Sequence, residues 1–65
     1  MSITLTVDGM SCDHCEETVE DALTGVAGVQ TASADREAGT AVVEGDADAA
    51  ALVAPVEDAG YDATA

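Results

Sequence analysis

The chain begins with two successive patterns of apolar and polar residues. Residues 2–7 alternate between polar and apolar side chains, and this period of two predicts a half-buried strand. From Asp13 to about Thr24 the apolar positions recur every three or four residues, which predicts a helix with one side facing a core. That stripe consists of Cys15, Val19, Ala22, Leu23 and Val26. Ser11 or Asp13 is expected to cap the start of this helix, and Gly25 to close its end.

Two further strands are expected in the middle of the chain. The segments 29–35 and 40–44 contain β-branched and small residues, and the polar run between them has the length of a hairpin turn. In the second of these strands, Ala41 and Val43 are expected to face the core and Val42 the solvent, because side chains alternate along a strand.

The last third of the chain predicts a second helix and a short final strand. The alanine-rich segment 47–59 places its larger apolar residues on one helical stripe, and Asp46 or Asp48 could cap it. Pro55 lies inside this segment. Because proline lacks an N–H and clashes with the preceding turn, we expect a kink or a break there. Residues 61–64 are expected to form the last strand.

The resulting order of elements is β-α-β-β-α-β over residues 1–65, which predicts one α+β domain. An antiparallel four-stranded sheet with both helices on one face, the split-βαβ arrangement, fits this order. A chain of 65 residues buries a modest share of its unfolded surface, so we expect marginal stability.

The charge balance is strongly acidic. Fourteen Asp and Glu residues stand against Arg36 and no lysine, which gives a formal net charge of −13. Nucleic acids and anionic membranes attract basic surfaces, so neither is expected as a partner. The sequence has no apolar run long enough for a membrane span and no signal peptide, which favours a cytoplasmic protein. Few cations and small core residues suggest adaptation to molar salt, where most of the self-repulsion is screened.

Both cysteines and the only histidine lie in residues 9–15, whose sequence is Gly-Met-Ser-Cys-Asp-His-Cys. This segment follows the first predicted strand and enters the first predicted helix. In the cytosol a pair such as Cys12 and Cys15 is kept reduced, which indicates metal binding or redox chemistry more than a structural disulfide. The less favoured alternative is that both are small buried core residues, as free cysteines often are.

The number of thiols limits the metals that the pair can hold. Thiolates select soft ions such as Cu(I) and zinc, but a closed zinc site needs four ligands and no second cysteine pair exists. Two sulfurs suffice for an ion that accepts linear coordination, which favours Cu(I) and leaves the site open to a partner's thiol. Cys12, in the loop, is expected to be the more exposed and mobile ligand. Acidic neighbours raise a thiol pKa and the helix start lowers it, so the pattern gives no net direction.

Four other side chains require an interpretation. His14 adjoins Cys15 on the helix, and because adjacent helical residues do not face each other, an exposed position is favoured over ligation or tuning of the thiol environment. Met10 could donate a thioether, but packing of the loop against the core is favoured. Tyr61 is the only aromatic residue and should lie beside the loop, where it could shield the thiolates or only cover the core. Arg36 is expected to be a solvated turn residue far from the loop.

With these residues identified, the chain resembles the heavy-metal-associated domains of the copper-chaperone type over nearly its whole length. The resemblance rests on GMSCDHC at 9–15, which matches the family's G-M-x-C-x-x-C loop. GV at 25–26 and AGYDA at 59–63 support it. With its acidic, lysine-free surface, the chain resembles a haloarchaeal member of the family.

The resemblance implies both a fold and the roles of individual residues. The family fold is ferredoxin-like, with Cys12 and Cys15 as the metal ligands. Met10 corresponds to a loop anchor packed in the core, and Tyr61 to a residue beside the ligands. Ser11, before the first cysteine, resembles the copper-type loop, whereas zinc- and cadmium-type members often carry an acidic residue there.

The favoured function is therefore that of a soluble, non-enzymatic Cu(I) chaperone. One Cu(I) would bind Cys12 and Cys15 and pass by thiol exchange to the metal-binding domain of a P-type copper ATPase, the partner that the resemblance implies. The protein is expected to be a monomer without metal, and a metal-bridged dimer is plausible. Met1 and the complete set of elements favour a free-standing protein. The alternatives are zinc, cadmium or mercury binding by the same pair, and, less favoured, a dithiol redox protein.

Overall fold

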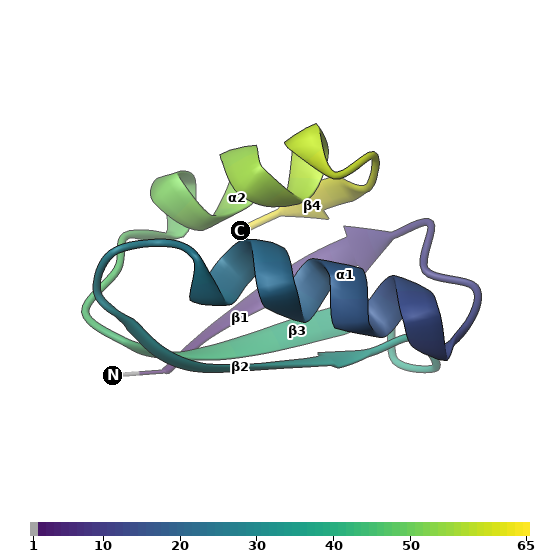
Figure 1. Cartoon of the computed structure of the whole chain (residues 1–65), viewed down its shortest axis with the longest axis horizontal. Coiled ribbons are helices and arrows are strands. Elements are labelled where there is room, and N and C mark those ends of the chain that lie inside the picture. The colour runs from purple at the N-terminus through teal and green to yellow at the C-terminus, as the bar shows by residue number, and fades with distance from the viewer. Residues whose placement is uncertain (1) are drawn as a thin grey trace.

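The computed structural model describes residues 2–65 as a four-stranded antiparallel sheet covered on one face by two helices (Figure 1). The order of strands across the sheet is β2-β3-β1-β4, which is the ferredoxin-like arrangement that the sequence predicts. The elements are β1 (Ser2–Asp8), α1 (Asp13–Thr24), β2 (Val29–Asp35), β3 (Thr40–Gly45), α2 (Ala49–Asp58) and β4 (Asp62–Thr64).

One apolar core fills the space between the sheet and the helices. The strands direct alternate side chains inward, in agreement with the period of two along the sequence. The buried residues are Leu5, Val7, Val19, Leu23, Ala41, Val43, Leu52, Val56 and Ala63. Val42 lies on the opposite face of the sheet and is 39% exposed, so its predicted orientation is confirmed. No charged or polar side chain within residues 2–65 is buried, so the polar chemistry lies at the surface.

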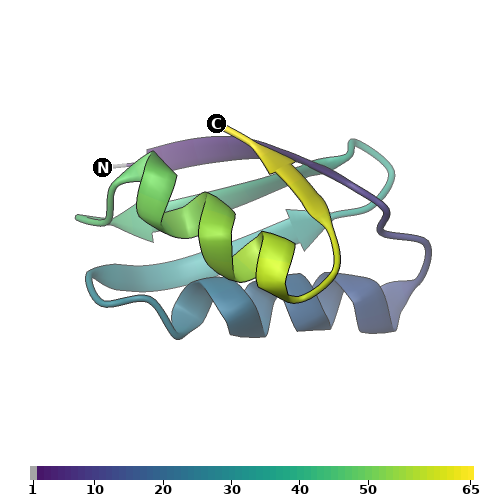
Figure 2. The ribbon, with the colours of Figure 1, turned by 90° about the horizontal axis from the view of Figure 1, so that it is seen from above.

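Three chain connections meet at one end of the sheet. β1 pairs with both β3 and β4, and its last residue, Asp8, lies opposite Asp62 at the start of β4. The turn between β2 and β3 reaches the same end, where the Gly39 carbonyl accepts a hydrogen bond from the Val7 N–H at 2.8 Å. In Figure 2 the β1–α1 loop, the β2–β3 turn and the α2–β4 loop lie together on the right. The candidate site lies at this end.

The start of α1 differs from the predicted caps. Cys12, rather than Ser11 or Asp13, occupies the N-cap position, and no side chain caps the helix. The Cys12 carbonyl accepts the N–H groups of Cys15 and Glu16 at 3.1 and 3.3 Å. The Asp13 carboxylate is engaged elsewhere, in an ion pair described below. The helix therefore begins with its free N–H groups next to the cysteines.

α2 continues through Pro55 as a single helix, so of the two predicted outcomes, a kink or a break, the break is wrong. Leu52 and Val56, on either side of the proline, are both buried in the core. Their packing outweighs the one backbone hydrogen bond that proline removes. Asp48 occupies the N-cap position of α2, as one of the two predicted candidates, but its side chain makes no capping bond. No helix within residues 2–65 has the length and hydropathy to cross a membrane.

Candidate metal centre

The loop between β1 and α1 turns sharply at Gly9 and is packed from both sides. Gly9 has φ of 103°, a conformation that favours glycine. A Cβ atom at this position would lie 3.4 Å from Cδ1 of Tyr61, so the aromatic ring lies directly against the loop. Met10 is partly buried and packs against the core. The loop is thus held by Met10 beneath it and by the Tyr61 ring beside it.

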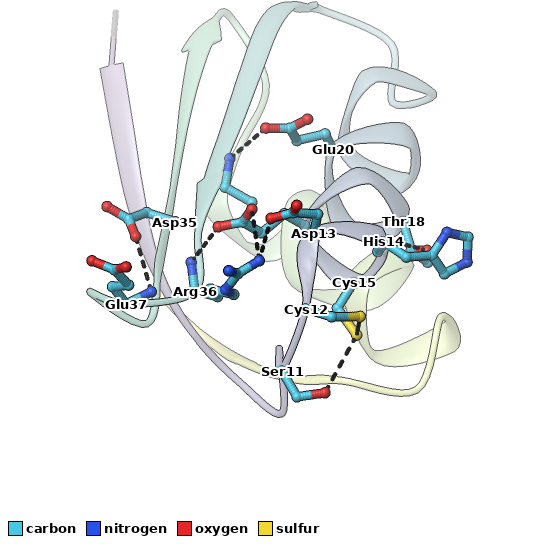
Figure 3. Close-up of polar contacts among 12 residues, drawn as sticks. Ser11, Cys12, Asp13, His14, Cys15, Thr18, Glu20, Asp35, Arg36 and Glu37 are labelled. Carbon is cyan, nitrogen blue, oxygen red and sulfur yellow. Dashed lines mark hydrogen bonds and ion pairs between the residues drawn. The ribbon is translucent and has the colours of Figure 1, made fainter.

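The two cysteines lie together at the start of α1, with both thiols free. Their Sγ atoms are 3.4 Å apart, and the Ser11 hydroxyl lies 3.8 Å from Sγ of Cys15 (Figure 3). Cys12 is exposed and has the extended backbone of an N-cap residue, whereas Cys15 is partly buried in the first helical turn. The expectation that Cys12 is the more exposed of the pair is therefore met by the geometry, and neither cysteine is a core residue.

Hydrogen-bond donors around Cys15 determine the direction of its pKa shift, which the sequence leaves open. The pKa of Cys15 is lowered from 9.0 to about 6, chiefly by the backbone N–H of Ser11 and next by the Tyr61 hydroxyl. The Cys12 thiol and the Ser11 hydroxyl lower it further, and partial burial opposes them. Donors that stabilise the thiolate outweigh the loss of solvation. The Cys15 sulfur is accordingly a thiolate near neutral pH.

Tyr61 contacts both the core and the β1–α1 loop with its ring. The interaction of its hydroxyl with Cys15 is the main reason that the pKa of Tyr61 is raised. The residue reaches the thiols because β4 pairs with the end of β1, although it lies 46 positions after Cys15 in the sequence.

His14 points away from the two sulfurs. In Figure 3 its ring projects to the right, away from the two sulfur atoms. The residue is exposed, and its backbone carbonyl accepts a hydrogen bond from the Thr18 hydroxyl at 2.9 Å. Across residues 2–65, no group of three or more His, Cys, Asp or Glu side chains is arranged to hold a metal ion. The candidate centre is therefore a two-thiol site.

The expected position of Arg36, far from the loop, is wrong. Its guanidinium pairs with the Asp13 carboxylate, and Nη1 lies 3.9 Å from Oε1 of Glu16. Its backbone N–H donates to Oε2 of Glu16 at 2.7 Å. The physical reason is topological: α1 runs away from the site and β2 returns to it, so the end of β2 lies beside the start of α1. The order of elements could have revealed this neighbour, whereas the composition of the turn could not.

The arrangement suits exchange of a small ligand at the surface. No pocket opens among the described residues, so the two sulfurs lie at the surface and are not enclosed. One thiolate is stabilised by fixed donors and the other is exposed at the end of a loop. Soft metal ions bind such sulfurs in preference to oxygen ligands.

Comparison with known proteins identifies the family. The model of the heavy-metal-associated domain matches residues 4–62, and the chain belongs to this family. The chain is 47% identical over 62 residues to the copper chaperone CopZ of Staphylococcus saprophyticus, an overlap of 91% of each chain.

Solved structures of similar proteins have the same fold as this chain. A structure of a CopZ metallochaperone superposes with a TM-score of 0.93 at 36% identity, covering 98% of this chain and 100% of that one. A copper-binding domain from HMA7, a P-type ATPase, gives a TM-score of 0.92 at 35% identity, covering 97% and 89%. The ferredoxin-like fold is thereby confirmed.

The expected haloarchaeal resemblance is not borne out, because the 47%-identical relative is staphylococcal. An acidic composition describes the surface of a protein and does not by itself identify its lineage.

Proposed function

We propose that this protein is a non-enzymatic cytoplasmic copper chaperone that binds one Cu(I) through Cys12 and Cys15. The observation that carries the proposal is the pair of free sulfurs 3.4 Å apart at an exposed helix start. The family supports metal binding, and the similarity to a copper chaperone supports copper as the cargo. His14 lies outside the proposed ligand set, and Met10 and Tyr61 hold the loop and the thiolate in place.

The geometry of a two-sulfur site favours Cu(I). With metal–sulfur bonds of about 2.3 Å, the value for zinc thiolates, linear binding places two sulfurs at most about 4.6 Å apart. The sulfurs would have to separate by roughly 1 Å from their present distance of 3.4 Å. Cys12 can provide this movement, since it lies in the loop, while Cys15 is fixed in α1. A tetrahedral zinc ion would lack two ligands here.

We further propose that the ion leaves by thiol exchange with the metal-binding domain of a P-type copper ATPase. A partner thiolate forms a bond to copper and the bond to Cys12 breaks. A second partner thiolate then replaces Cys15, and the copper remains Cu(I) throughout. The two departing cysteine thiolates can take up the protons that the partner thiols have released. The similarity to a copper-binding domain of a P-type ATPase supports this kind of partner.

The test of metal binding is a titration of the reduced protein with Cu(I) and with Zn(II), each in competition with a chelator of known affinity. We expect one Cu(I) per chain, with binding weakened by at least about 100-fold in Cys12→Ser and in Cys15→Ser because one of two ligands is lost. His14→Ala serves as the control and should bind like the wild type. Tight zinc binding at one per chain without tight Cu(I) binding would contradict the proposal and favour zinc, cadmium or mercury as the cargo.

A dithiol redox protein is the second candidate, and one observation favours it. The pKa of Cys15, at about 6, lies in the range of attacking thiols, so the acidic neighbours are no argument against this chemistry. Catalytic reduction of a disulfide substrate by the metal-free protein would support the redox function. Stoichiometric oxidation without turnover would support the chaperone.

A further inference from the structure

Each of the two cysteines is directly followed by an acidic residue, and Arg36 contacts both acidic side chains. Asp13 follows Cys12, and its carboxylate pairs with the Arg36 guanidinium. Glu16 follows Cys15, and its two oxygens face Arg36 Nη1 at 3.9 Å and the Arg36 backbone N–H at 2.7 Å. In Figure 3, Asp13 and Arg36 lie to the left of the cysteines, and His14 lies to the right. The β2–β3 turn is thereby joined to the helical turn that carries both sulfurs.

These contacts differ in strength. The Asp13 side chain is 88% exposed, so its ion pair is screened by solvent and contributes little alone. The side chains of Glu16 and Arg36 are 23% and 35% exposed, and the backbone N–H of Arg36 is a fixed donor. The Glu16 carboxylate is therefore held more firmly than the Asp13 carboxylate. Since Glu16 adjoins Cys15, this contact restrains the less mobile of the two sulfurs.

We propose that Arg36 is a positioning residue for the thiol pair: it fixes the first turn of α1 so that Cys15 stays in place while Cys12 moves. This inference rests on the proposed copper function. The N–H groups of Cys15 and Glu16 both bond to the Cys12 carbonyl, so the backbone of the turn behaves as one unit and the movement is left to the Cys12 side chain. Anchoring this turn in advance reduces the conformational entropy that is lost when Cu(I) binds. The affinity for Cu(I) therefore rises.

Charge adds to the geometry. Two thiolates with one Cu(I) carry a net charge of −1, and the neighbouring carboxylates repel it. Arg36 is the only Lys or Arg among the 65 residues, and it lies against two of these carboxylates. Both carboxylates face the same atom, Nη1, so the guanidinium acts here mainly as a positive charge between them.

The test compares Cu(I) affinity, by chelator competition, among the wild type, Glu16→Ala and Arg36→Gln. We expect Glu16→Ala, which loses its contacts with both the backbone N–H and the guanidinium of Arg36, to bind Cu(I) about tenfold more weakly, the lower end of the effect of residues that orient metal ligands. Arg36→Gln keeps the backbone N–H and should lose less affinity. An unchanged affinity in either variant would overturn the inference.

The matched control is Glu20→Ala, one helical turn further from the cysteines. Oε2 of Glu20 accepts the Ala34 N–H at 2.8 Å, so this variant also loosens the contact between α1 and β2. We expect a similar fall in the unfolding temperature with unchanged Cu(I) affinity. An equal loss of affinity would show that Arg36 acts only through general stability. Failure of the wild type to bind Cu(I) would instead refute the proposed function, and with it the inference.

Discussion

At the scale of single residues, the two sulfurs have different surroundings and therefore different tasks. Cys15 is held in the first turn of α1 with donors from Ser11 and Tyr61 around it. Cys12 is exposed at the end of the loop. An ion shared by such a pair can be released from one side while it remains bound on the other. This asymmetry favours transfer over storage.

The Tyr61 hydroxyl is predicted to hold Cys15 in its thiolate form. In the wild type, thiolate ultraviolet absorbance should rise with pH through about 6 as Cys15 loses its proton. Removing the hydroxyl in Tyr61→Phe should move this midpoint to higher pH, because the thiolate loses a donor. Ser11→Ala is the control: it removes a weaker donor and leaves the dominant Ser11 N–H, so its shift should be smaller. An unmoved midpoint in Tyr61→Phe would contradict the assignment.

At the scale of elements, periodicity in the sequence predicts what depends on local burial. The helix predicted from Asp13 to Thr24 and the strand predicted over 29–35 have the observed bounds. Their patterns are strong because one side of each element faces the core. The second helix is shorter than predicted and spans Ala49–Asp58. An alanine-rich sequence does not indicate at which residue a helix begins or ends. The predicted break at Pro55 fails because core packing on both sides outweighs a local preference.

Features set by contacts between elements were harder to predict. The capping prediction for Asp13 fails because the carboxylate pairs with Arg36, which is 23 residues away. Gly45 is another case: its φ is 140°, and a Cβ there would lie 2.1 Å from the Gly28 carbonyl oxygen. Nothing local to Gly45 indicates this approach of another loop. Tyr61, by contrast, could be placed beside the loop because the element order fixes which ends of the strands meet.

At the scale of the whole molecule, charge is the dominant feature. The net charge of −13 is carried by a body whose longest extent is 28 Å. At 0.01 M salt the screening length of about 30 Å is comparable with that extent, so the surface charges repel one another across the molecule. At 1 M salt the length falls to about 3 Å and little of this repulsion remains.

The unfolding temperature is therefore predicted to rise with KCl, by roughly 5 °C or more between about 0.01 and 1 M, as expected for about 1 kcal/mol in a domain of this size. Circular dichroism measures the midpoint. A variant carrying Glu17→Gln and Glu57→Gln, both at exposed positions, has a lower charge and should depend less on salt. A midpoint independent of KCl in the wild type would contradict this account of the charge.

The central claim is that the thiol pair gives up Cu(I) by exchange with a partner's thiols. The most direct measurement mixes the Cu(I)-loaded protein with a metal-free, dithiol-containing metal-binding domain of a P-type copper ATPase and follows the transfer rate as the acceptor concentration increases. We predict a rate that rises with acceptor concentration, because the partner thiol binds the copper before Cys12 leaves. A rate that stays at the value of spontaneous copper dissociation at every acceptor concentration would contradict the claim.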